Sequence, residues 1–295
     1  MNSEQARPGS GGSQVAYRLV STLGGRGPGP QCFERALRGI SVGDARGVIA
    51  VGDSALKVFD PAGALVAEWS TGQEAHSVAV DAAGRVLVGE LDQVEIFDRA
   101  GQRESVLRDP PRLGRVTALA PLADGLLVAD AAARCLRRYT RDGEHLADIG
   151  RDNRMQGFLI PNGVLDFAVD ERGVIHAANP GKHRVERYSA QGELLGHFGR
   201  FDGRDPAGFA GCCNPTNVTV SAGGRVFVTE KAAPRAKVYD PQGGLLAVIA
   251  SEVFDPGCKN MDLAVDASGR VYVVDTARLA ILVFEPEPLG ESDER

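Results

Sequence analysis

One pattern of strands and turns repeats along most of this chain, and it constrains the fold more strongly than any other feature. The unit is an apolar alternating strand, an Asp/Gly turn, a second strand, a loop, a third strand, a Gly turn and a fourth strand. Residues 76–88 (His-Ser-Val-Ala-Val-Asp-Ala-Ala-Gly-Arg-Val-Leu-Val) and 94–101 show it clearly, and residues 262–274 repeat it late in the sequence.

Glycines mark both turns of the unit. Each tight hairpin needs a position with positive φ, which glycine adopts without strain. Six first turns predict six blades, each a four-stranded antiparallel sheet. The first-turn glycines are Gly47, Gly84, Gly125, Gly173, Gly224 and Gly269, and the second-turn glycines are Gly63, Gly101, Gly143, Gly192 and Gly243.

The sixth second turn is missing, because the last repeat stops after its third strand, 280–284. A segment at the other end of the chain, 17–23, matches the outer strands 64–69 and 193–198. This indicates that an N-terminal outer strand pairs with the C-terminal blade and leaves no edge unpaired there. The predicted fold class is therefore all-β, a six-bladed β-propeller closed in this way.

Over residues 17–285 the sequence resembles the NHL-repeat family of propellers. The signatures Val-Asp-x-x-Gly-Arg-Val and Val-Phe-Asp-x-x-Gly carry the resemblance, and the run Gly-Cys-Cys-Asn-Pro at 211–215 resembles a bacterial subgroup. The resemblance implies the fold; it does not imply one activity, since such propellers serve as scaffolds, ligand binders and enzymes.

Composition narrows the function classes. A net charge of −6, with the 33 Lys and Arg spread along the chain, argues against a nucleic-acid partner, and no apolar run is long enough for a membrane span. We expect a disordered tail over 1–16, one propeller over 17–285 and an acidic tail over 286–295. Residues 1–14 lack the apolar segment of a signal peptide, so a cytoplasmic location is expected.

Connectivity assigns the loops to two faces. In a four-stranded blade the loop between strands two and three lies on the same face as the link to the next blade, and both Gly turns lie on the opposite face. We call the first of these the link face. Its links are long and irregular, and binding residues favour such loops on a rigid frame. The predicted links are 24–39, 70–75, 109–115, 151–164, 199–215 and 251–260.

Four of the five cysteines fall in these links: Cys32, Cys212, Cys213 and Cys258. In a reducing compartment we expect thiols or metal ligands, not a disulfide framework. Thiolates of Cys212, Cys213 and Cys258, with His183 as a further ligand, would suit a soft metal such as zinc or copper. Burial as small hydrophobic residues and a Cys212–Cys213 disulfide are the alternatives. Cys135, inside a strand, is predicted to be structural.

Asp166, Asn217 and Asp262 occupy one repeat position, near the start of the innermost strand, which Ser77 shares. They are predicted to ring the channel mouth, where their oxygens would bind calcium or a ligand. The alternative is that they hydrogen-bond neighbouring backbone and hold the blades in register. Lys231 and Arg235 are a candidate anion-binding pair.

The sequence leaves three functions open. The first is a propeller that binds a small molecule or a soft metal on its link face. The second is a metal-dependent enzyme, a lyase or a lactonase-like hydrolase, in which His76 would face the channel. The third is a scaffold for protein partners.

Overall fold

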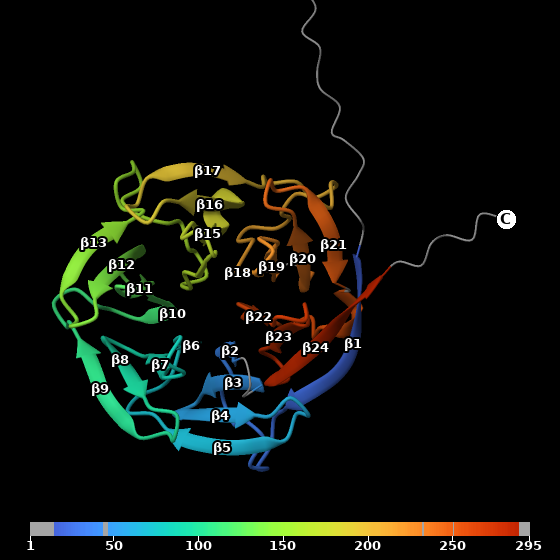
Figure 1. Cartoon of the computed structure of the whole chain (residues 1–295). Helices are drawn as coiled ribbons and strands as arrows, with labels where there is room; N and C mark the ends of the chain where they lie inside the picture. Colours follow the sequence, from blue (N-terminus) through green and yellow to red (C-terminus); the bar gives the residue numbers. More distant parts are fainter. Residues whose placement is uncertain (1–14, 44–46, 232, 250, 289–295) are drawn as a thin grey trace, which may run out of the picture.

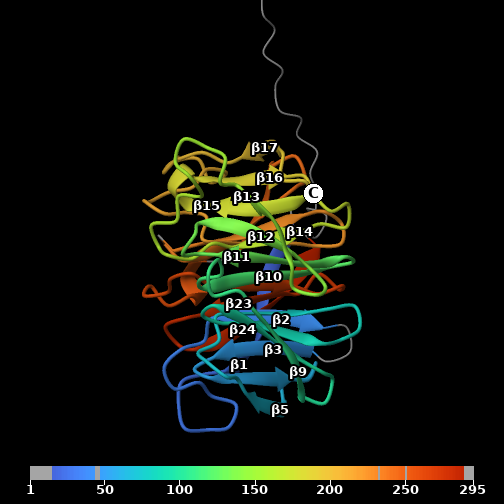
Figure 2. The same ribbon diagram turned by 90° about the vertical axis from the view of Figure 1, so that its left-hand side faces the viewer.

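A computed structural model describes residues 15–43, 47–231, 233–249 and 251–288. In this part of the chain the strands form six four-stranded antiparallel sheets, arranged as blades around a central axis (Figure 1). Figure 2 shows the ring from the side, with loops emerging at its two faces. The predicted fold class is confirmed.

The first five blades follow the chain from the innermost strand outward. The first blade comprises β2 (Gly39–Gly43), β3 (Gly47–Gly52), β4 (Ala55–Phe59) and β5 (Leu65–Ser70). The second comprises β6 (Ser77–Val80), β7 (Val86–Gly89), β8 (Gln93–Phe97) and β9 (Arg103–Arg108). The third comprises β10 (Val116–Leu122), β11 (Gly125–Asp130), β12 (Cys135–Thr140) and β13 (His145–Ile149).

The fourth blade comprises β14 (Phe167–Val169), β15 (Ile175–Asn179), β16 (Arg184–Tyr188) and β17 (Leu194–Phe198). The fifth comprises β18 (Asn217–Val220), β19 (Val226–Glu230), β20 (Arg235–Tyr239) and β21 (Leu245–Ile249). Short 3₁₀ turns, η1 (Pro180–Lys182) and η2 (Ser251–Val253), lie in loops. None of the described helices is long and apolar enough to cross a membrane.

The sixth blade contains both ends of the described chain. Its order is β1 (Val15–Gly24), β24 (Ala280–Pro288), β23 (Val271–Asp275) and β22 (Leu263–Val265), so β1 is the outer strand. The pairing of β1 with β24 runs from Val15 opposite Pro288 to Gly24 opposite Ala280. It confirms the predicted closure and extends it at both ends. Of the predicted tails, residues 1–14 and 289–295 lie outside the described residues.

Glycine supplies the expected positive φ at the hairpin turns, with one exception. Gly125 begins β11 and pairs with Leu122 across a two-residue turn, and it is not among the positive-φ glycines. The expected reason for this glycine is therefore wrong. A Cβ at Gly125 would lie 2.0 Å from the carbonyl oxygen of Tyr139, so the close approach of the neighbouring strand requires the glycine.

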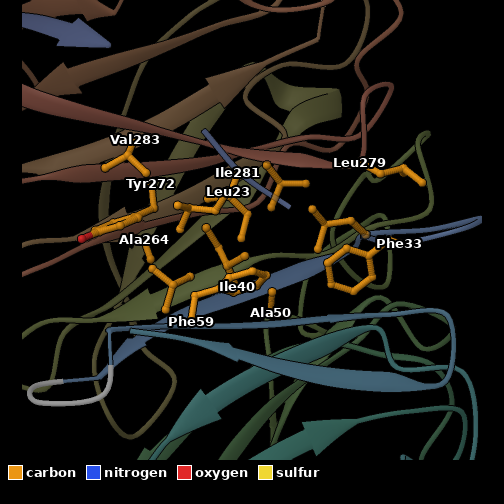
Figure 3. Packing of buried hydrophobic residues seen from close by; sticks show 13 residues of the cluster. Leu23, Phe33, Ile40, Ala50, Phe59, Ala264, Tyr272, Leu279, Ile281 and Val283 are labelled. Atoms are coloured by element: carbon orange, nitrogen blue, oxygen red, sulfur yellow. The ribbon is translucent and has the colours of Figure 1, made fainter. Parts of the chain in front are cut away.

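The core lies between the blades. Within the described ranges, buried apolar side chains form six clusters, and each joins one blade to the next. Figure 3 shows the cluster that closes the ring, in which Leu23 of β1 and Ile281 of β24 pack with Ile40 and Phe59 of the first blade. The N-terminal strand therefore contributes to an interface between blades as well as to a sheet.

Candidate functional site

The links on the link face are held by polar residues at the ends of the second strands. Asp53 Oδ1 accepts a hydrogen bond from the N–H of Ala36 at 2.9 Å, and Glu90 Oε1 accepts one from the N–H of Gln73 at 2.8 Å. Asp130, Asn179 and Asp275 bind N–H groups of Gly114, Leu159 and Asp255 in the same way. Since buried backbone donors need partners, these side chains fix the loops that carry the site.

A cavity of about 420 Å³ opens where the links converge on the axis. We call it the mouth pocket. It draws residues from five of the links, from the loop between β23 and β24, and from the first residues of inner strands. Its lining residues are Arg35, Ala36, Leu37, Arg38, His76, Arg115, Thr117, Asn162, Gly163, Val164, Asn217, Gly257, Lys259, Asn260, Thr276 and Leu279.

Four cationic side chains line this pocket: Arg35, Arg38, Arg115 and Lys259. Arg38 forms a salt bridge with Glu74, and the Arg115 guanidinium donates to the carbonyl oxygen of Gly163 at 2.7 Å. The side chain of Arg35 is 80% exposed and lies 3.7 Å from Asp53. The ammonium of Lys259 has no partner among the described residues. The pocket is therefore cationic in a chain whose net charge is −6.

His76 supplies an uncharged imidazole to the same pocket. Burial lowers the pKa of His76 to about 4, and the positive charge of Arg38 adds to this effect. The ring is consequently neutral at pH 7, and one of its nitrogens can accept a hydrogen bond or a proton. The structure confirms that this residue lies at the channel mouth, as its repeat position indicates.

Asp166, Asn217 and Asp262 meet just below the mouth pocket. Asn217 lines that pocket, whereas the two aspartates line a second cavity of about 310 Å³ inside the channel. The Asn217 side chain interacts with both carboxyl groups and favours their ionised forms, against the effect of burial. Burial raises the pKa of Asp262 to about 7, and burial together with the charge of Asp262 raises the pKa of Asp166 well above its usual value.

These two carboxyl groups also join blades. Asp166 Oδ2 accepts the N–H of Val218 in the fifth blade at 2.8 Å, and Asp262 Oδ2 accepts the N–H of Ile40 in the first blade at 2.7 Å. This geometry fits the structural alternative, in which the residues hold adjacent blades in register. Calcium binding by these oxygens stays a prediction.

The four predicted soft-metal ligands occupy three separate surroundings. Cys212 and Cys213 contact each other, with their Sγ atoms 3.1 Å apart. The Cys258 thiol is buried in the interface between blades five and six and donates to Asp275 Oδ1 at 3.0 Å. The His183 ring packs edge-on against Phe201, with ring centroids 5.0 Å apart. Among the described residues no group of three or more His, Cys, Asp or Glu is placed to hold a metal ion.

The other two cysteines have unlike surroundings. Cys135 is fully buried in β12, and burial raises its pKa to about 12. Cys32 is half-buried in the first link.

Lys231 and Arg235, the predicted anion-binding pair, interact with different groups. Arg235 forms a salt bridge with Glu230, which is fully buried and also binds Lys237 at 3.1 Å. The positive charge of Lys231 acts on the cysteine pair and favours the thiolate form of both thiols. Neither residue lines the mouth pocket.

Sequence reasoning did not select the arginines and the lysine of the mouth pocket. A signal was present, because Arg38 immediately precedes the innermost strand at the register that His76 occupies in the next blade. Arg115 and Lys259 also lie a few residues before inner strands. Position in a link, more than residue type, brings these side chains together.

Comparison with solved structures gives several propellers. A streptogramin B lyase structure matches with a TM-score of 0.60 and 11% identity, over 85% of this chain and 79% of that one. Virginiamycin B lyase from Staphylococcus aureus matches with a TM-score of 0.58 and 11% identity, over 94% and 90%. A protein of unknown function from Bacteroides thetaiotaomicron matches with a TM-score of 0.71 and 16% identity, over 93% and 77%.

The likeness shows the fold alone. At these identities the site residues of another propeller do not transfer to this one. No protein-family model matches the sequence, and the comparison with curated proteins gives no match. The function of this chain therefore has to be argued from its own mouth pocket.

Proposed function

We propose that this protein binds a small anionic molecule in the mouth pocket. The observation that carries the proposal is the convergence of Arg35, Arg38, Arg115 and Lys259 on one cavity of about 420 Å³. A cavity of this size suits a small ligand. Carboxylate and phosphate groups are the anions that guanidinium and ammonium groups bind best.

The charge distribution supports this ligand class. Four cations line the pocket, and two carboxylates, Glu74 and Asp53, contact them. The two buried aspartates below would balance the remaining positive charge only if both were ionised. Their raised pKa values favour protonated forms instead. The pocket consequently keeps an excess of positive charge, which attracts anions from solution.

His76 favours a second candidate, an enzyme that acts on the bound anion. Its neutral imidazole lines the same cavity and can take a proton from a substrate. On this proposal the substitution His76→Gln would abolish turnover while changing the Kd of the anion by no more than about twofold.

The binding proposal is tested by replacing Lys259, whose ammonium makes no contact that the fold needs. Phosphate, sulfate, citrate and succinate are titrated at constant ionic strength by calorimetry. We expect at least one to bind, and Lys259→Gln to raise its Kd on the order of fivefold to tenfold, as loss of one partly screened charge pair requires.

Arg204→Gln is the matched control, because it removes one positive charge from a link outside the pocket. Its Kd should equal that of the parent. The proposal fails if none of the anions binds, or if the two variants weaken binding equally.

A further inference from the structure

The most unusual chemistry outside the mouth pocket is the cysteine pair of the β17–β18 link. The side chain of Cys212 is exposed, whereas Cys213 is only 5% exposed. Their sulfur atoms are 3.1 Å apart, so the two thiols are already in contact. The Cys212 thiol is accessible to a molecule from solution, and the Cys213 thiol is buried in contact with it.

The loop around the pair is held on both sides. The buried Asn214 side chain donates to the carbonyl oxygen of Ala210 at 2.6 Å and accepts the N–H of Lys231 at 2.9 Å. Phe209 is fully buried next to the loop, and the ammonium of Lys237 donates to the carbonyl oxygen of Gly208. The contact between the two thiols is therefore built into the fold and does not depend on a mobile tip.

Lys231 adds charge that suits a reactive pair. The hydrogen bond with Cys213 lowers the pKa of Cys212 most, and the positive charge of Lys231 lowers it further. The same charge favours the thiolate form of Cys213. Burial raises the pKa of Cys213. The exposed thiol is thus the more acidic of the two, and thiolate is the nucleophilic form.

Backbone geometry makes a bond between these sulfurs reversible. Consecutive Cα atoms are about 3.8 Å apart, whereas disulfides usually join Cα atoms that are about 4.4–6.8 Å apart. A disulfide between neighbouring residues is consequently strained, and strained, exposed disulfides are the easily reduced ones. Such a bond suits a couple that cycles and does not suit a permanent crosslink.

We propose that Cys212 and Cys213 form a dithiol–disulfide couple that exchanges with small disulfides. The Cys212 thiolate attacks one sulfur of the incoming disulfide, forms a mixed disulfide and releases the other half as a thiolate. Cys213 then attacks the Cys212 sulfur, the second thiolate leaves, and the protons of the two cysteines pass through solvent to the two released thiols. The protein pair is oxidised and the small disulfide is reduced.

The experiment uses the full chain and oxidised glutathione as the disulfide. Reduced protein is incubated with it, remaining thiols are alkylated, and peptides are identified by mass spectrometry. We expect the parent to carry a Cys212–Cys213 bond without bound glutathione. Cys213→Ser should instead keep glutathione on Cys212, and Cys212→Ser should react at least about tenfold more slowly, because its remaining link-face thiols are buried or half-buried.

Cys32→Ser is the matched control and should behave as the parent does. Because Cys213 is buried, Cys213→Ala is measured beside Cys213→Ser, and melting curves confirm that both fold. Glutathione on Cys32, an identical adduct in the parent and in both Cys213 variants, or no reaction at all would each overturn the proposal.

Discussion

At one repeat position, near the start of the innermost strand, the side chain hydrogen-bonds the backbone of the next blade. Ser77 and Thr117 hydrogen-bond carbonyl oxygens in the next blade, those of Val116 and Leu165. Asp166 and Asp262 at the same position bind backbone N–H groups of the next blade instead. The position thus serves blade-to-blade pairing whether its side chain is a donor or an acceptor. Only the aspartates add an ionisable group to the channel.

The raised pKa of Asp262 predicts a pH dependence of stability. Unfolded aspartate loses its proton near pH 4, whereas folded Asp262 keeps its proton until about pH 7. The stabilisation is complete below about pH 4 and is lost as the pH rises to about 7, at up to about 1.4 kcal/mol per pH unit for one retained proton. Asp262→Asn should flatten this slope.

Urea unfolding at several pH values between about 4 and about 7 measures the effect on the free energy of unfolding. Asp240→Asn, at an exposed turn on the opposite face, is the control and should leave the slope unchanged. A parental slope in Asp262→Asn would show that this carboxyl group is not the one that holds the proton.

At the scale of elements, β1 is the strand that closes the ring. It pairs with β24 over its whole length, and Leu23 lies in the buried cluster between the sixth and first blades. Tyr17 also packs edge-on against Phe227 of the fifth blade, with ring centroids 6.4 Å apart. The strand therefore joins three blades.

Deletion of residues 1–24 should lower the free energy of unfolding by at least several kcal/mol, because it removes a ladder and buried apolar area together. It should also promote association through the exposed edge of β24. Deletion of residues 1–14 is the control, since the described pairing begins at Val15. Thermal melts and light scattering compare the two, and equal results would contradict the closing role of β1.

At the scale of the whole molecule, closure makes all blades alike in their neighbours. Each of the six apolar clusters in the described ranges lies between two blades. The cluster between the sixth and first blades contains at least as many buried residues as any of the others. A repeat array that is open would fray from its ends. A closed ring has no terminal blade, so its blades should open together.

Amide hydrogen exchange tests this expectation. In the intact chain the inner strands β2 and β22 should be protected as strongly as β10, because opening any blade breaks two interfaces. In the chain lacking residues 1–24 the sixth blade should exchange fastest and the third blade should change least. Faster exchange of β22 than of β10 in the intact chain would mean that the ring opens at the sixth blade, where the two ends of the described chain pair.

The sequence by itself determined the number of blades, their strand order and the closing strand. The reason is that turn glycines and alternating strands such as those of 262–274 are local signals that recur in every blade. Even there, the reason predicted for the glycine at position 125 was wrong. A glycine is required because the carbonyl oxygen of Tyr139, in the neighbouring strand, lies too close for a Cβ. The two strands of the closing pair, predicted at 17–23 and 280–284, are longer in the structure for the same reason, because the pairing partner decides where a strand ends.

Only the tertiary structure decided which side chains form the site. The links do not repeat, so nothing local shows that Arg38 and Lys259 line the same pocket. Cys258 was expected beside Cys213, but Asp275 at the end of its own blade's second strand takes its thiol. Arg235 is likewise taken by the buried Glu230. Buried polar groups must be satisfied wherever the fold places them, and that requirement directs side chains which sequence spacing leaves free.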